Sequence, residues 1–346
     1  MRAKQSFFLT LITMPLLAFA ANLAPAKPNI VVILVDDMGF GDLSLNGREE
    51  WQTPHIDRLS EEGMNFTAAT VTAPQCGPSR AGLISGVYQQ RIHMASNRQI
   101  HRGNSFPEEM KTFAEYMVDG GYRTGMVGKW HLGHKKGQTP NDRGFEYFYG
   151  FLGGTSWFLP QTSVGETHIH GILENRVPVK ETRYLTDALT THAIDFVNGE
   201  TVSGNEQEKP FFLYLSYNAP HVPLEAPQEY IDRFPELADR YPPVKVGWGK
   251  YLRDCSNPGQ VYAAMMVNLD DNIGRFMENL KDQGLDQNTL VIFLCDNGAP
   301  VPATYASNQP FRGVKGEVLE GGIHTPFFAH WPAVIPANSS SDVPIS

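Results

Sequence analysis

Cysteine, excess basic charge and long apolar runs are all scarce in this sequence. Three cysteines in 346 residues exclude a small fold framed by disulfides. Lys and Arg number 28 against 37 Asp and Glu, a formal charge of −9, so we expect no nucleic-acid partner, because no basic stripe is available to neutralise phosphates. No apolar stretch after the first twenty residues approaches a membrane-spanning length, and we expect no stable membrane insertion.

The first twenty residues are typical of an export signal. Arg2 and Lys4 precede a 14-residue apolar run that starts at Phe7 and ends in the small-x-small sequence Ala-Phe-Ala. A run of that length is short for a bilayer-spanning helix, which favours a cleaved signal over the alternative of an uncleaved anchor. We therefore predict a signal peptide over residues 1–20, a mature chain over 21–346, and a protein that is exported to the periplasm or secreted.

Apolar runs alternate with helical patterns along most of the mature chain. Asn29–Val35 is a continuous β-branched run, typical of a strand buried on both faces of a parallel sheet. A long amphipathic helix begins at Pro258 and ends at Gly284. This alternation predicts an α/β fold with a large, mostly parallel central sheet sandwiched by helices. Further strands are expected at Phe211–Ser216 and Thr289–Cys295, and further helices at Met110–Met117, at Tyr184–Val197 and from Pro54 with Thr53 as its N-cap.

Polar residues follow three of the expected strands. Asp36 and Asp37 come after the first, His221 comes shortly after the second, and Asp296 and Asn297 come after the third. The carboxyl ends of parallel strands are where sites form in open α/β sheets. Carboxylate and amide oxygens suit a hard cation such as Ca²⁺ or Mg²⁺ better than zinc. Turn capping, which uses the same residue types, is the alternative reading at each of these places.

Cys76 opens the segment Cys-Gly-Pro-Ser-Arg. Pro78 suits the first turn of a helix, which places Cys76 at or just before a helix N-terminus, and Arg80 adds a cation one turn away. A residue in that position can hold an anion or act as an activated nucleophile, and an ordinary buried cysteine is the alternative. Cys255 and Cys295 remain as a candidate disulfide pair, although a buried thiol at the end of an apolar run is ordinary too.

Six blocks of the sequence resemble the type I, formylglycine-dependent sulfatases, which are arylsulfatase-like members of the alkaline phosphatase superfamily. Cys76–Gly86 (CGPSRAGLISG) is similar to the first sulfatase signature, and Gly121–Gly133 (GYRTGMVGKWHLG) is similar to the second. The other four blocks are PNIVVILVDDMGFGD, NAPHVP, CDNG and PFRGVKGEVLEGGIHTPFFAHWP, and all six keep the family order between Pro28 and Pro332. Six ordered blocks are a far more specific signal than a lone Cys-x-Pro-Ser-Arg.

This resemblance implies a modified residue, one metal ion and a set of catalytic residues. A maturation enzyme would convert Cys76 to formylglycine, and the hydrate of that aldehyde would supply the nucleophilic oxygen. The implied ligands of one Ca²⁺ are Asp36, Asp37, Asp296, Asn297 and the converted Cys76. The implied catalytic residues are Arg80, Lys129 and His131 around the hydrate, and His221 and Lys315 on the sulfate and the leaving oxygen.

The implied activity is hydrolysis of a sulfuric ester, with release of inorganic sulfate from a sulfated small molecule or carbohydrate such as a polysaccharide. One alternative is hydrolysis of phosphonate monoesters or phosphodiesters, which relatives in the same superfamily carry out. Another is a shortened, inactive protein that only binds sulfated glycans. Sulfatases usually continue into a small C-terminal subdomain, whereas this sequence stops at Ser346, so we expect residues 21–346 to be a catalytic domain in which that subdomain is missing or incomplete.

Overall fold

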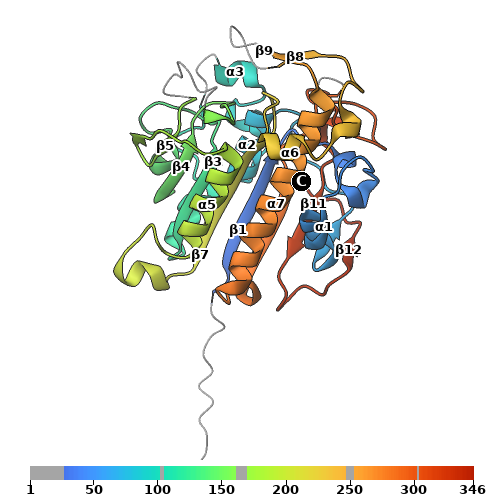
Figure 1. Ribbon diagram of the computed structural model, residues 1–346. Helices are drawn as coiled ribbons and strands as arrows, with labels where there is room; N and C mark the ends of the chain where they lie inside the picture. The colour runs from blue at the N-terminus through green and yellow to red at the C-terminus, as the bar shows by residue number, and fades with distance from the viewer. Residues whose placement is uncertain (1–26, 102–104, 161–169, 247–252, 302–303) are drawn as a thin grey trace, which may run out of the picture.

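A ten-stranded sheet runs through the centre of the molecule (Figure 1). The computed structural model describes residues 27–101, 105–160, 170–246, 253–301 and 304–346. The strand order is β12-β2-β11-β10-β1-β7-β3-β4-β5-β6, and the five central strands from β10 to β4 are mutually parallel. Short antiparallel strands flank them on both sides. The predicted α/β class with a large, mostly parallel sheet is confirmed.

The sheet and a separate two-stranded ribbon, β8-β9, account for the strands described. Their bounds are β1 Asn29–Asp36, β2 Met64–Phe66, β3 Arg123–Lys129, β4 Tyr147–Phe151, β5 Leu173–Glu174, β6 Val177–Pro178, β7 Phe211–Pro220, β8 Val244–Val246, β9 Arg253–Cys255, β10 Thr289–Cys295, β11 Phe327–His330 and β12 Ser339–Ser341. The α-helices are α1 Pro54–Glu61, α2 Cys76–Ser85, α3 Asn97–His101, α4 Phe113–Asp119, α5 Leu185–Val197, α6 Gln228–Ile231, α7 Pro258–Asp282 and α8 Glu320–Ile323.

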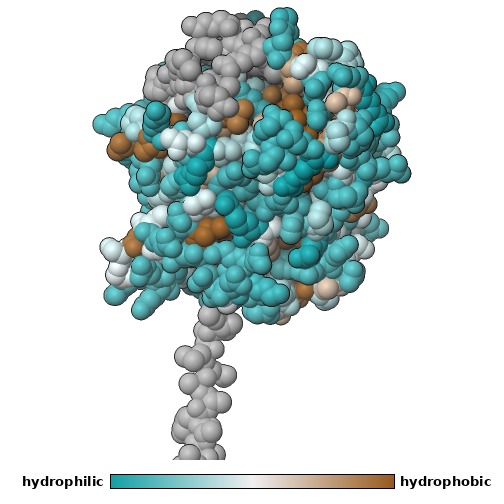
Figure 2. Space-filling view, in the orientation of Figure 1, coloured by the Kyte–Doolittle hydropathy of each residue, from teal (hydrophilic) through white to brown (hydrophobic). Residues whose placement is uncertain are grey.

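Each face of the sheet carries its own hydrophobic core, because successive side chains of a strand point to opposite faces. In β1, Val31, Ile33 and Val35 join the core under α1, α5 and α7. Val32 and Leu34 join the second core, to which α2 and α4 contribute. Figure 1 shows α5 and α7 side by side across one face of the sheet, and Figure 2 shows that this side of the molecule is mostly hydrophilic on the outside. The continuous apolar character of β1 thus reflects burial on both faces.

Some predicted boundaries and contacts differ from those observed. The helix expected from Met110 starts at Phe113, because Thr112 and Glu115 form a capping box: Glu115 N–H donates to Thr112 Oγ1 (3.2 Å) and Thr112 N–H donates to Glu115 Oε2 (2.8 Å). Thr53 does precede α1, but its hydroxyl donates to Asp57 Oδ1 (2.9 Å) instead of capping a backbone N–H.

The candidate disulfide between Cys255 and Cys295 is absent. Both residues are free, buried cysteines, one in the β8-β9 ribbon and the other at the end of β10. The predicted signal peptide, residues 1–20, lies outside the residues that the structure describes. Within the described ranges, no helix combines the length and the apolar character needed to cross a bilayer.

Candidate active site

The carboxyl ends of four parallel strands bring the predicted site residues to one edge of the sheet. Asp36 is the last residue of β1 and Lys129 the last of β3. Asp296 directly follows β10, and His221 directly follows β7. Because Val35 is in register with Cys295, the two acidic turns leave the sheet side by side. The parallel register therefore assembles residues that are far apart in the sequence, as the strand-end rule predicts.

Buried ion pairs connect the acidic and basic residues at this edge of the sheet. These residues form a charged cluster of Asp36, Asp37, Arg80, Lys129, His221, Asp296 and Lys315. Lys129 Nζ donates to Asp36 Oδ2, and both side chains are fully buried. Lys315 Nζ lies 2.6 Å from each carboxylate oxygen of Asp37. Burial would raise the pKa of Asp37, but Lys315, His221 and Lys129 outweigh burial and hold that pKa below its usual range. Asp37 is therefore an anion at neutral pH.

Arg80 is fully buried and ties α2 to three strands. Its Nε and Nη2 donate to Asp296 Oδ2 at 3.0 and 2.8 Å, and Nη2 lies 3.7 Å from Asp36 Oδ2. Its Nη1 donates to the carbonyl of Lys129 (3.1 Å) and to Ser216 Oγ. A planar guanidinium can satisfy all these acceptors at once, whereas an ammonium cannot. The sequence reasoning missed Ser216, for which a hydroxyl inside an otherwise apolar strand was the available signal.

Cys76 is the first residue of α2 and is 1% exposed. Its Sγ lies 3.2 Å from Lys315 Nζ and 4.0 Å from Asp37 Oδ1. Burial would raise the pKa of the Cys76 thiol, but Lys129 and Lys315 outweigh burial and lower it to about 6. The surroundings of Cys76 thus stabilise negative charge at the atom that the first signature singles out.

Asn97, in α3, steadies the start of α2. Its N–H donates to Gln75 Oε1 (3.0 Å), and its Oδ1 accepts a hydrogen bond from the N–H of Gly77 (3.1 Å). These two hydrogen bonds hold the residues on both sides of Cys76. Sequence reasoning did not identify Asn97, because its role depends on which segment packs against α2.

His221 is anchored through one ring nitrogen and turned toward Asp37 with the other. Nδ1 lies 2.6 Å from the carbonyl of Val222, and Nε2 lies 3.5 Å from Asp37 Oδ2. The same carbonyl accepts a hydrogen bond from Thr155 Oγ1 (2.9 Å). Burial lowers the pKa of His221, but Asp36 and Asp37 outweigh burial and raise it above its ordinary value. A ring that donates through Nδ1 presents Nε2 to the cluster.

Two of the predicted site residues have a left-handed backbone. Asp37 has φ 65° and His131 has φ 61°, a region that costs a non-glycine residue free energy and is concentrated at functional sites. His131 follows β3 by two residues and is 5% exposed. Its ring packs against Gly154, where a Cβ would lie 2.7 Å from Nε2. The ring of His131 can thus occupy this position only because residue 154 is a glycine.

The oxygen atoms of the cluster suit a hard divalent cation. Asp36 Oδ1 and Asn297 Oδ1 are buried, and among the described residues neither has a hydrogen-bond partner. Asn297 Nδ2 donates to Asp37 Oδ1 (2.7 Å), which fixes the orientation of that amide. A buried polar atom without a partner calls for an explanation, and at a group of carboxylates a bound ion is one. Potential ligand atoms of Asp36, Asp37, Cys76 and His221 all lie within 4.8 Å of one another. The residues therefore fit Ca²⁺, although Asp296 Oδ2 is already bound by Arg80.

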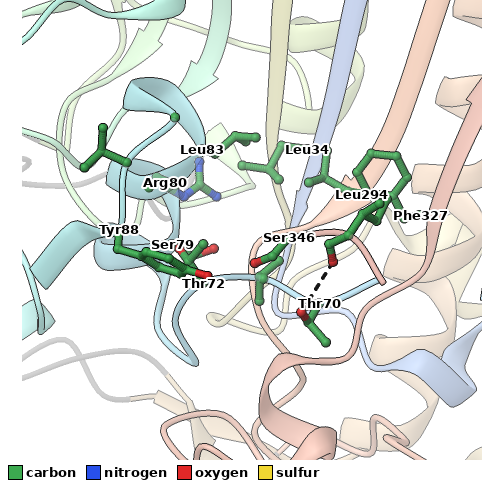
Figure 3. A pocket seen from close by; sticks show the side chains of 15 residues that line it. Leu34, Thr70, Thr72, Ser79, Arg80, Leu83, Tyr88, Leu294, Phe327 and Ser346 are labelled. Atoms are coloured by element: carbon green, nitrogen blue, oxygen red, sulfur yellow. Dashed lines mark hydrogen bonds between the residues drawn. The ribbon is translucent and has the colours of Figure 1, made fainter. Parts of the chain in front are cut away.

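A largely apolar groove of about 460 Å³ lies on the α2 side of the sheet (Figure 3). Leu34, Leu83, Leu294 and Phe327 supply much of its lining, and Arg80 is the residue that it shares with the charged cluster. The polar atoms of Arg80 are committed to the cluster, so they do not change the apolar character of the groove.

Comparison with known proteins decides the family. The sequence model of the sulfatase family, described as "Sulfatase", matches residues 28–346. The chain belongs to the sulfatase family. The chain is 31% identical to N-acetylgalactosamine-6-sulfatase of Mus musculus over 98% of its own length, and 32% identical to an arylsulfatase of Klebsiella aerogenes over 89%. It spans 63% of the Mus musculus protein and 75% of the Klebsiella protein.

Several solved structures share the architecture of this chain. Ps i-CgsB in complex with k-i-k-neocarrahexaose is 35% identical, with a TM-score of 0.81 over 92% of this chain and 69% of the other. PsFucS1 sulfatase from Pseudoalteromonas sp. is 26% identical, with a TM-score of 0.66 over 91% of this chain and 64% of the other. A phosphonate monoester hydrolase of Agrobacterium radiobacter is only 20% identical, with a TM-score of 0.62 over 92% of this chain and 71% of the other, which shows the fold alone.

Proposed function

We propose that this sulfatase is an exported enzyme that hydrolyses a sulfate ester of a carbohydrate to an alcohol and inorganic sulfate. The observation that carries the proposal is the position of Cys76, buried beside Lys315 and 4.0 Å from the anchored carboxylate of Asp37, in a family whose first signature centres on this cysteine. The carbohydrate class is supported by Ps i-CgsB, whose structure holds a neocarrahexaose.

The nucleophile would be the side chain of residue 76 after a maturation enzyme has converted Cys76 to formylglycine. A sulfate ester is an anion, so an approaching anionic nucleophile needs fixed positive charge around it. Lys315, bound to Asp37, and Lys129, bound to Asp36, would supply that charge, and Arg80 adds a third cation. Because all three are anchored by hydrogen bonds, they need no reorganisation when the substrate arrives.

The metal ligands would be Asp36, Asp37, Asp296, Asn297 and the converted Cys76. A bound Ca²⁺ supplies positive charge that polarises the sulfate oxygens and the nucleophile. The buried Oδ1 atoms of Asp36 and Asn297, for which the described residues provide no partner, support this ligand set.

Proton transfer would fall to the two histidines and Asp296. His221 holds its Nδ1 on the carbonyl of Val222, so Nε2 is the atom that would donate a proton to the leaving oxygen as the S–O bond breaks. Asp296 would accept a proton from the attacking hydroxyl. His131 would accept the proton of the second hydroxyl when sulfate leaves and the aldehyde is restored.

The first test is the chemical state of residue 76 together with sulfate release. We expect mass spectrometry of protein made in its native host to show formylglycine in the tryptic peptide Leu59–Arg80. Cys76→Ala should release no measurable sulfate from sulfated oligosaccharides, while Cys255→Ala, in the β8-β9 ribbon, should match the parent. Sulfate release by Cys76→Ala at the parental rate would refute the mechanism. Tight glycan binding without sulfate release, in a sample with confirmed formylglycine, would show a binding protein instead.

A further inference from the structure

The thiol of Cys295 links the two turns that carry the proposed calcium ligands. Cys295 is the last residue of β10 and is fully buried. The N–H of Met38 donates to its Sγ (3.2 Å), and its S–H donates to the carbonyl of Asn297 (3.0 Å). One sulfur atom therefore accepts from the turn after β1 and donates to the turn after β10. We propose that Cys295 is a positioning residue for the calcium site, an inference that rests on the proposed metal-dependent function.

Cys295 lies where the pairing of β1 with β10 ends and the two turns begin. Val35 and Cys295 are the last register pair between β1 and β10, and the N–H of Asp296 donates to the carbonyl of Val35 (3.0 Å). Beyond this point Asp37 turns into the left-handed region, with φ 65°. Such a conformation persists only where surrounding contacts hold it. The Met38–Cys295 hydrogen bond holds the residue that follows Asp37, and the Asp37 N–H donates to Asp296 Oδ1 (3.3 Å).

The second hydrogen bond of the thiol acts on Asn297. Its carbonyl is held by Cys295, and its side-chain Nδ2 donates to Asp37 Oδ1 (2.7 Å). With backbone and amide nitrogen both fixed, the remaining oxygen, Oδ1, keeps one orientation as a ligand atom. Groups that orient metal ligands from behind typically change metal affinity 10- to 100-fold when they are removed. A buried, unpaired cysteine at this position thus has a function that requires no disulfide.

Two substitutions of Cys295 distinguish the effect of its hydrogen bonds from the effect of losing side-chain volume. Serine keeps one donor and two acceptor lone pairs, so Cys295→Ser retains partners for Met38 N–H and for the Asn297 carbonyl. Cys295→Ala removes both partners and leaves two buried backbone groups unsatisfied. The matched control is Cys255→Ala, which removes the other buried thiol outside the charged cluster.

The test is calcium affinity of the full chain, measured by isothermal titration calorimetry after removal of metal with a chelator. We expect Cys295→Ala to weaken Ca²⁺ binding by about 10-fold or more, Cys295→Ser to stay within about threefold of the parent, and Cys255→Ala to bind as the parent does. Near-UV circular dichroism without metal checks that each variant is folded.

Parental affinity in Cys295→Ala would overturn the proposal, as would a Cys295→Ser variant as weak as Cys295→Ala. Should Cys295→Ala fail to fold, Cys295→Ser alone decides, and a tenfold loss in that variant overturns it. A parent chain that binds no Ca²⁺ overturns both this proposal and the metal site. Because titration does not depend on turnover, a parent that binds Ca²⁺ but releases no sulfate refutes the proposed function while leaving the role of Cys295 intact.

Discussion

At the scale of single residues, the cluster is built by side chains that each serve several partners. Arg80 donates to one oxygen of Asp296, to Ser216 and to a backbone carbonyl, so it joins three strands while it balances buried negative charge. Removing one partner of such a buried charge pair leaves an uncompensated charge, which typically costs about 3–5 kcal/mol. The residues that surround Cys76 are therefore difficult to change one at a time.

Thr155 offers a mild way to disturb His221, the proposed proton donor. Its hydroxyl and the Nδ1 of His221 share the carbonyl of Val222, so the hydroxyl restrains the carbonyl on which the ring is anchored. We expect Thr155→Val to lower kcat for sulfate release by about tenfold with little change in KM, because a displaced proton donor acts on the chemical step. Thr155→Ser, which keeps the hydroxyl, should remain within about threefold of the parent.

Steady-state kinetics and the ¹⁵N chemical shifts of the His221 ring provide the measurement. Thr191→Val in α5, which removes a hydroxyl bonded to the carbonyl of Asp187 (2.9 Å), is the control and should leave both unchanged. Equal activities of Thr155→Val and the parent would contradict the assignment, as would equal losses in the valine and serine variants.

At the scale of elements, the start of α1 is held by an acid from α7. Asp270 Oδ1 accepts the N–H groups of His55 (3.1 Å) and Ile56 (2.8 Å), which are in the first turn of α1. Burial raises the pKa of Asp270 from 3.8 to about 7, although these two N–H groups favour its charged form. The start of α1 is thus held on α7 by the carboxyl group of Asp270, and folding favours the protonated form of that group.

This raised pKa predicts a pH-dependent stability. Since the folded state holds the proton of Asp270 more tightly than the unfolded state, the contribution of Asp270 to stability is greatest below about pH 4 and declines as the pH rises toward 7. Asp270→Asn keeps an oxygen for both N–H groups but has no proton to release. Relative to this variant, the free energy of unfolding of the parent should fall by about 2–4 kcal/mol between pH 4 and pH 8.

Urea unfolding at a series of pH values provides the measurement. Asp119→Asn in α4 is the control, because the Asp119 carboxylate is exposed and pairs with Lys111 at 2.7 Å, away from the contact between α1 and α7. This variant should keep the slope of the parent. Parallel curves for the parent and Asp270→Asn would show that Asp270 does not titrate in this range.

The sequence predicts some elements well because local composition decides them. β10 has its predicted bounds and β1 is only one residue longer than predicted, since a continuous β-branched run is compatible with little besides a buried strand. The start of α4 was missed because a capping box outweighed the apolar pattern around Met110. Of the two alternatives for Cys255 and Cys295, the structure has the buried free thiols and not the disulfide, a choice that the sequence left open because cysteine count carries no information on distance. Ser216 carried one local signal, a hydroxyl in an apolar strand, but its partner Arg80 is 136 residues away. Asn97 had no such signal, because its role depends on the packing of α3 against α2.

At the scale of the whole molecule, the proposed calcium site joins parts of the chain that lie far apart in sequence. Asn297 and Asp37 are in contact across 260 residues. An ion bound by both turns would stabilise the fold, because only the native state brings the ligands together; at a concentration 100 times Kd the gain is about 2.7 kcal/mol. We expect Tm to be roughly 5 °C higher in excess Ca²⁺ than in EDTA.

Differential scanning calorimetry provides the measurement. Asn297→Ala should lose most of the calcium-dependent rise, whereas Asn288→Ala, which removes an amide that donates to the Lys27 carbonyl (3.2 Å), should retain it. A Tm that is the same in Ca²⁺ and EDTA for the parent chain would contradict the metal assignment.

The long sequence separation within the charged cluster also means that its residues are synthesised at different times. Arg80 meets Asp296 across 216 residues, and β1 can complete its pairing only when β10 has been made. With elongation at about 5–20 residues per second, roughly 10 to 40 s pass between the appearance of the two partners. During that interval Cys76 has no closed pocket to enter. A thiol that is 1% exposed in the finished fold would thus be accessible to the proposed maturation enzyme while the chain is still growing, and burial afterwards would protect the chemical form of residue 76.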